Sequence, residues 1–282
     1  MCQIFALNSN TPSAVTFSFT GLSARGGVTG DHVDGFGLAF HDGRACRLFI
    51  DEQRASDAAL ADFLRRHPLR ARTVLAHVRK ATQGPVRLEN CHPFVREWQG
   101  RQWSFCHNGD LKGFAPRLSG GHLPVGDTDS ERAFCWLLQG LRRHFGRPCA
   151  RRPGPPWQQV APVLAGLAAG VARLGTFNFL LSDGEVLYAH ASTRLHALQR
   201  QHPFAAAHLV DHDLMLDLAQ ANGPGDRMVL IATEPLTRNE PWRPFAPGEL
   251  RVYAAGEELW RHTPVRHPEP AAQPRGRLAM AS

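Results

Sequence analysis

Cys2 is the first residue whose position could give it a chemical role. Residue 2 is small enough for removal of Met1, which would leave a free α-amino group and a thiol on one residue. An α-amine of pKa about 7.7–8.0 can act as a base near neutral pH, and a thiol of pKa about 8.5 is a matching nucleophile. Such a cysteine can supply nucleophile and base together, through a bridging water. The alternative is a buried strand cysteine without a catalytic role.

Two further clusters follow predicted strands. In His77-Val78-Arg79-Lys80-Ala81-Thr82, an arginine at a strand end suits a fork that holds a carboxylate, and the alternative is a structural ion pair. In Phe105-Cys106-His107-Asn108-Gly109, the strand is expected to end in a turn at Asn108-Gly109. An Asn amide beside a free glycine N–H would form an oxyanion hole with two donors, whereas the alternative is an ordinary turn.

Asp129 lies in the predicted first turn of a helix, where the helix dipole favours a carboxylate. The carboxylate could pair with a substrate ammonium, although for Asp129 taken alone the helix-cap reading is favoured. Taken singly, each cluster favours a structural explanation without a catalytic role. Together they supply a nucleophile with its base, a carboxylate clamp, an oxyanion hole and an ammonium partner, which fits an amino-acid amide such as glutamine.

The elements that must position these residues are predicted from local patterns. Hairpins are expected at Asp42-Gly43 and at Ser182-Asp183-Gly184, and Thr128-Asp129-Ser130-Glu131 reads as a capping box. Strands are expected over Cys2–Asn8, Phe36–His41, Ala45–Ile50, Thr73–Arg79, Gln102–Cys106, Phe177–Leu181, Glu185–His190, Met228–Thr233 and Leu250–Ala255, and helices over Ser56–Arg66, from Thr128 to about Phe145, and over Gln158–Arg173. Strand pairs in blocks with two helices between them favour an α+β fold.

Composition excludes several classes of protein. The 282 residues contain no apolar run of about 18 residues, so we expect no membrane span, and no export signal is evident, so we expect a cytoplasmic protein with reduced thiols. The net charge is +7, but 30 of the 32 basic residues are scattered arginines, which does not favour nucleic-acid binding. The six cysteines and 15 histidines show no zinc-site spacing, and we expect neither a metal nor a cofactor.

The chain resembles the class II glutamine amidotransferases, in particular their stand-alone bacterial YafJ-type branch. The resemblance rests on motifs from Cys2 to Asp129, in the order Cys2, Arg25-Gly26, Asp34-Gly35-Phe36-Gly37, His77-x-Arg79-x-Ala81-Thr82, Asn90-Cys91-His92-Pro93, His107-Asn108-Gly109 and Thr128-Asp129. It implies the N-terminal-nucleophile hydrolase fold, a four-layer αββα sandwich. We expect one such domain over residues 1–262, with Gly146–Pro156 as an insertion loop, and a disordered tail over residues 263–282.

The resemblance also implies roles for single residues. Cys2 would attack the side-chain amide of glutamine to give a glutamyl thioester and ammonia, and Asn108 and Gly109 would stabilise the oxyanion. Arg79 with Thr82 would bind the α-carboxylate, and Asp129 would bind the α-ammonium.

Arg25 and His92 match family positions near the pocket. Lys80 departs from the aromatic residue that often follows the arginine of the clamp.

Two substrate classes fit the same candidate residues, because these residues would contact only the glutamyl group. The first is glutamine, with ammonia delivered to a separate acceptor protein, since no acceptor domain is evident in the sequence. The second is a γ-glutamyl peptide or γ-glutamyl thiol conjugate, which would be hydrolysed.

Overall fold

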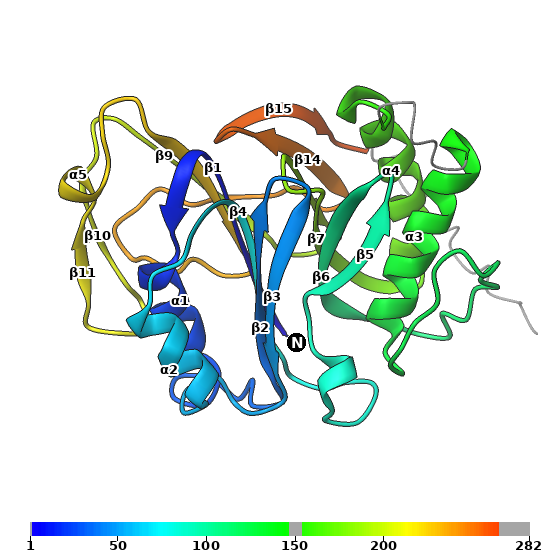
Figure 1. Cartoon of the computed structure of the whole chain (residues 1–282), viewed down its shortest axis with the longest axis horizontal. Helices are drawn as coiled ribbons and strands as arrows, with labels where there is room; N and C mark the ends of the chain where they lie inside the picture. Colours follow the sequence, from blue (N-terminus) through cyan, green and yellow to red (C-terminus); the bar gives the residue numbers. More distant parts are fainter. Residues whose placement is uncertain (1, 147–153, 265–282) are drawn as a thin grey trace, which may run out of the picture.

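Two antiparallel sheets form the centre of the molecule in a computed structural model, which describes residues 2–146 and 154–264 (Figure 1). The first has seven strands in the order β13-β9-β12-β1-β4-β2-β3. Its strands are β1 (Gln3–Ala14), β2 (Phe36–Asp42), β3 (Ala45–Asp51), β4 (Arg70–Val78), β9 (His196–Gln201), β12 (Arg227–Ala232) and β13 (Arg243–Pro244).

The second sheet has six strands in the order β15-β14-β8-β7-β6-β5. They are β5 (Phe94–Trp98), β6 (Arg101–Leu111), β7 (Gly175–Ser182), β8 (Val186–Ala191), β14 (Glu249–Ala254) and β15 (Glu257–His262). The remaining elements are α1 (Thr16–Ala24), α2 (Ala59–Arg66), a 3-10 turn η1 (Leu88–Asn90), α3 (Asp129–Phe145), α4 (Trp157–Ala172), and a small hairpin of β10 (Ala206–His208) and β11 (Met215–Asp217) followed by α5 (Leu218–Ala221).

Helices cover the outer face of each sheet, which gives the expected four-layer αββα sandwich of an α+β fold (Figure 1). The alternation of side chains along β1 separates the apolar layers. Phe5 and Leu7 pack toward α1 and α2, whereas Ile4 and Ala6 lie in the layer between the two sheets. A third apolar layer joins the six-stranded sheet to α3 and α4. Because both faces of the central strands are buried, their sequences are nearly continuous apolar runs.

Most of the predicted elements are confirmed with shifted ends. Both hairpins form where expected, and α3 begins with the Thr128 hydroxyl accepting the Glu131 N–H at 3.2 Å. The second contact that a capping box predicts, from the Thr128 N–H to the Glu131 carboxylate, is wrong. The Glu131 carboxylate instead pairs with Arg96 and accepts the N–H groups of Val125 and Gly126.

One prediction near the proposed site is also wrong. Asn108-Gly109 is not a turn but lies inside β6, where Asn108 pairs with Asn178 and Gly109 with Phe177. The long register with β7 overrides the local turn preference of the dipeptide. A side chain on Gly109 would collide with the Thr176 carbonyl, so close approach of β7 is what requires glycine here.

Residues 147–153 of the expected loop, and residues 265–282 of the expected tail, lie outside the described residues. None of the described helices combines the length and apolar character needed to cross a bilayer. The five cysteines in the described ranges are free thiols, namely Cys2, Cys46, Cys91, Cys106 and Cys135.

Candidate active site

Cys2 directly precedes β1, a central strand of the seven-stranded sheet, and its side chain is buried. The pairing of Gln3 with Val78 brings the end of β4 alongside it. As a result, the Cys2 Sγ accepts the Lys80 N–H at 3.3 Å and lies 3.2 Å from the Lys80 carbonyl oxygen. Burial raises the pKa of the Cys2 thiol, and the Lys80 N–H opposes that rise. A thiol in this environment needs a base before it can attack a carbonyl carbon.

Asn108 reaches Cys2 from the other sheet. Its side-chain amide nitrogen donates to the Cys2 carbonyl oxygen, although the two residues are 106 positions apart. Asn108 lies in β6 and is fully buried, so this contact joins the two sheets across the interior of the sandwich. A side-chain amide has two N–H donors, so one remains for a further acceptor near Cys2.

Asn178 is a site residue that the sequence analysis missed. Its Nδ2 donates to the Asn108 Oδ1 at 2.9 Å and to the Thr193 hydroxyl at 2.9 Å. Its Oδ1 accepts the N–H groups of Thr193 and Arg194 at 3.0 and 3.2 Å. This network occupies the Asn108 Oδ1, and so it fixes the Asn108 amide with its donors toward Cys2. The available signal was one polar residue in the apolar strand Phe177–Leu181.

Asp129 is the first residue of α3 and lies close to the end of β6. Its Oδ2 accepts the Leu111 N–H at 2.8 Å, and its Oδ1 accepts the Ser130 N–H at 2.8 Å. Leu111 follows Gly109 in β6 by two positions, which places the Asp129 carboxylate beside the strand that carries Asn108. These bonds fit the helix-cap reading of Asp129, and the Ser130 hydroxyl also donates to its Oδ1 at 3.4 Å. The Oδ2 keeps a second lone pair, which the ammonium reading requires.

Arg79 follows β4 and is buried, with its guanidinium inside the loop that continues to η1. Its Nη1 donates to the carbonyls of Asp34 and Pro85 at 3.3 and 3.2 Å. Its Nη2 donates to the carbonyls of Gln83 and Gly84 at 3.1 and 3.2 Å. A carboxylate bound at Nη1 or Nη2 would have to displace at least one of these carbonyls, so substrate binding there requires the loop to shift.

Thr82 lies on the same loop and is exposed, which leaves its hydroxyl accessible to a ligand.

Arg25 and His92 have structural contacts. The Arg25 guanidinium pairs with Asp211 at 2.7 Å and donates to Gln3 Oε1 and to the carbonyls of Glu234 and Pro235. Arg25 therefore connects Gln3, the residue after Cys2, to the segments that carry Asp211 and Glu234-Pro235.

The His92 ring stacks on His77 with 4.1 Å between ring centroids, and neither ring nitrogen of His92 has a hydrogen-bond partner among the described residues. Within residues 2–146 and 154–264, no group of His, Cys, Asp or Glu side chains is arranged to hold a metal ion.

Several buried histidines make stability depend on pH. Burial lowers the pKa of His77 to about 3, and the pKa values of His41 and His190 to about 4, from 6.5. The unfolded chain therefore binds more protons than the folded chain as pH falls below 6.5. The stability contributed by the neutral rings is complete above that pH and is lost as pH falls toward 4.

We expect the free energy of unfolding to fall by about 4 kcal/mol between about pH 7 and about pH 5.5, with these three rings contributing comparably. Urea denaturation at the two pH values measures the difference. The variant His41→Gln should lose roughly a third less over the same interval. An unfolding free energy that is equal or greater at the lower pH would contradict the assignment of these rings as buried and neutral.

Comparison with known proteins places the chain in context. The sequence model of a family described as "Glutamine amidotransferases class-II" matches residues 1–276. The chain is 43% identical over 259 residues to "Putative glutamine amidotransferase YafJ" of Escherichia coli (strain K12), covering 92% of this chain and 100% of that protein. It is 41% identical over 259 residues to "Putative glutamine amidotransferase" of Haemophilus influenzae, covering 92% and 86% of the two chains.

Solved structures agree with this relationship. A "predicted glutamine amidotransferase" from Pseudomonas aeruginosa superimposes with a TM-score of 0.72 at 40% identity, covering 92% of this chain and 100% of that chain. Glutamine phosphoribosylpyrophosphate amidotransferase from B. subtilis superimposes with a TM-score of 0.54 at 13% identity, covering 93% of this chain and 49% of that chain. The second likeness concerns the fold alone.

Proposed function

This chain belongs to the class II glutamine amidotransferases, enzymes that act on amide C–N bonds, and we propose that it releases ammonia from glutamine with Cys2 as the nucleophile. The observation that supports the proposal is the contact between Asn108 and Cys2, in which a side-chain amide of one sheet donates to the carbonyl of the residue that carries the thiol. The same contact leaves one donor of the Asn108 amide for the substrate oxygen.

The proposed reaction begins with removal of Met1, which converts the Cys2 nitrogen into an α-amine. That amine takes the thiol proton through a water, and the sulfur attacks the amide carbon of glutamine. The oxyanion that forms accepts hydrogen bonds from the Asn108 amide and the Gly109 N–H. Collapse of the intermediate returns the proton to the leaving nitrogen, releases ammonia and leaves a glutamyl thioester. Water then hydrolyses the thioester to glutamate and the free thiol.

Substrate orientation is assigned to three further residues. Arg79 and Thr82 bind the α-carboxylate, after the loop at residues 83–85 has released a carbonyl from the guanidinium. Asp129 binds the α-ammonium through the lone pair of Oδ2 that the Leu111 N–H leaves free. For the ammonia, we propose an acceptor carried by a separate protein.

The α-amine can be tested by blocking it. A short N-terminal extension that is not removed leaves the Cys2 nitrogen as an amide, and we expect kcat to fall by about 100-fold to 10,000-fold because the base is lost. The control carries the same extension with a protease site directly before Cys2. Cleavage, verified by intact mass, should restore turnover. Full activity of the uncleaved protein would eliminate the α-amine as base.

The substrate class can be tested with a panel of glutamyl compounds. We expect glutamate release from glutamine to exceed release from γ-glutamyl dipeptides and γ-glutamyl thiol conjugates at equal concentration. Ammonia should appear in equal amount to glutamate with glutamine. A higher kcat/KM for the γ-glutamyl conjugates would favour the second candidate, a γ-glutamyl hydrolase that uses the same Cys2 and Asn108.

A further inference from the structure

A cavity of about 410 Å³ lies far along β1 from Cys2, on the helix-covered face of the seven-stranded sheet. One wall consists of the end of β1 and the start of α1, and the opposite wall is β11 and α5, which stand apart at the edge of the molecule (Figure 1). Its volume falls in the range of small-molecule sites. None of the residues proposed for glutamine chemistry lines it.

The N-terminus of α1 presents unused donors to this cavity. Val15 at the cap position makes no side-chain hydrogen bond, and the first turn of α1 carries no acidic residue. The backbone N–H groups of Thr16, Phe17 and Ser18 have no partner among the described residues. Uncapped N–H groups and the helix dipole together favour an anion at this position.

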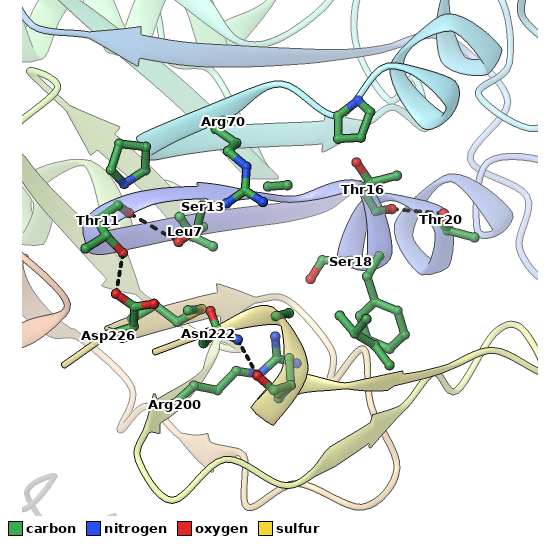
Figure 2. A pocket seen from close by; sticks show the side chains of 18 of the residues that line it. Leu7, Thr11, Ser13, Thr16, Ser18, Thr20, Arg70, Arg200, Asn222 and Asp226 are labelled. Carbon is green, nitrogen blue, oxygen red and sulfur yellow. Dashed lines mark hydrogen bonds between the residues drawn. The ribbon is translucent and has the colours of Figure 1, made fainter. Parts of the chain in front are cut away.

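Ser18 provides an independent sign of a ligand. Its side chain is 5% exposed, yet its hydroxyl makes no hydrogen bond with any described residue. Figure 2 shows the hydroxyl directed from α1 into the open space between the two walls. Because the hydroxyl opens only onto the cavity, a ligand acceptor bound there could take its hydrogen bond.

Two arginines add positive charge around the same space. Arg70 makes no ion pair with the described residues, and Figure 2 shows its guanidinium directed into the cavity. Arg200 pairs with Glu240 through Nε and Nη2, which leaves its Nη1 without a partner in the described part of the chain. The lining carboxylate, Asp226, lies with Thr11 at the other end of the cavity from Ser18 (Figure 2), and accepts the Thr11 hydroxyl and the Gly223 N–H.

The rest of the lining is largely apolar. Leu7, Leu218 and Met228 are buried beneath the cavity, whereas Met215 is 57% exposed at its rim. Methionine side chains adapt to ligands of different shape. The lining therefore combines an apolar surface with a group of donors at one end.

We propose that this cavity binds a small amphipathic anion, with its carboxylate or phosphate head at the N-terminus of α1 and its apolar body against Leu7 and Met228. The head accepts hydrogen bonds from the first-turn N–H groups and the Ser18 hydroxyl, and Arg70 pairs with its charge. The proposal is independent of the glutamine chemistry, because the two sites share no residue.

Calorimetric titration of the whole protein tests the proposal with two matched pairs of probes, octanoate with octanamide and phenyl phosphate with inorganic phosphate. We expect at least one organic anion to bind saturably, at least ten-fold more tightly than its partner in the pair. Absence of saturable binding by both octanoate and phenyl phosphate overturns the proposal. The proposal is also overturned if no anion that binds exceeds its partner in the pair ten-fold.

Two arginine variants locate the bound anion. Arg70→Gln should weaken binding of that anion about ten-fold, whereas Arg72→Gln, the same change two residues along β4 and outside the cavity lining, should not. Ser18→Ala should weaken the same anion several-fold. Equal affinity of the two arginine variants overturns the placement of the head. The variant Cys2→Ala should bind the anion like the unaltered protein, whatever its activity toward glutamine.

Discussion

Replacing Cys2 by alanine is expected to abolish glutamine hydrolysis, with a fall in kcat of about 10⁴-fold or more, because the nucleophile that forms the thioester is lost. A glutamine-mimicking electrophile should label the unaltered protein at Cys2 and should leave the variant unlabelled. Peptide mass spectrometry after labelling identifies the modified residue.

Cys46→Ala serves as the matched control. Cys46 lies on β3, and burial raises the pKa of its thiol to about 12, so it is not an available nucleophile at neutral pH. The control should keep full turnover and full labelling at Cys2. Labelling at Cys91 or Cys106 in place of Cys2 would show that the nucleophile has been misassigned.

Asn108→Ala should lower kcat by roughly 100-fold to 1,000-fold, the usual cost of one oxyanion donor. The KM for glutamine should change little, because the donor acts on charge that develops only in the transition state. Steady-state kinetics of the purified variant, with circular dichroism as a check of folding, measures both quantities. A fall of only a few-fold would remove Asn108 from the oxyanion site.

Asn178→Asp gives a sharper version of the same test. The new carboxylate can still accept the N–H groups of Thr193 and Arg194, but it cannot donate to the Asn108 Oδ1. Asn108 is then free to rotate its donors toward residue 178 and away from Cys2. We expect a fall in kcat of about ten-fold or more with KM nearly unchanged. An equal change in kcat and KM would indicate a general disturbance of the strand instead.

The fold was predictable wherever local signals agreed with tertiary packing. The Asp42-Gly43 and Ser182-Asp183-Gly184 hairpins and the Thr128 cap depend on short-range chemistry, and all three form. Helix α1 was missed because it is buried on most sides and lacks a capping side chain, so neither the helical period nor a start signal marks it. β15 was missed because its residues are mostly exposed at a sheet edge and do not alternate.

The candidate site residues could be named from the sequence, but their geometry could not. The motifs around Cys2, Arg79, Asn108 and Asp129 named the candidates, but no local pattern reveals that Asn108 crosses from one sheet to the other. The Asn-Gly turn failed for the same reason, since pairing with β7 is a long-range interaction. Asn178 could be recognised only once that pairing was known.

The apolar layer between the sheets mixes large side chains with alanines, among them Ala6, Ala39, Ala189 and Ala191. These methyl groups affect how closely the two sheets approach. That spacing in turn affects the distance between the Cys2 sulfur and the Asn108 side-chain amide. A bulkier residue in this layer would move the two sheets apart. The protein would still fold, but the proposed reaction would be slower. We therefore expect the proposed turnover to depend on sheet spacing, and so on alanines that lie away from the proposed substrate site.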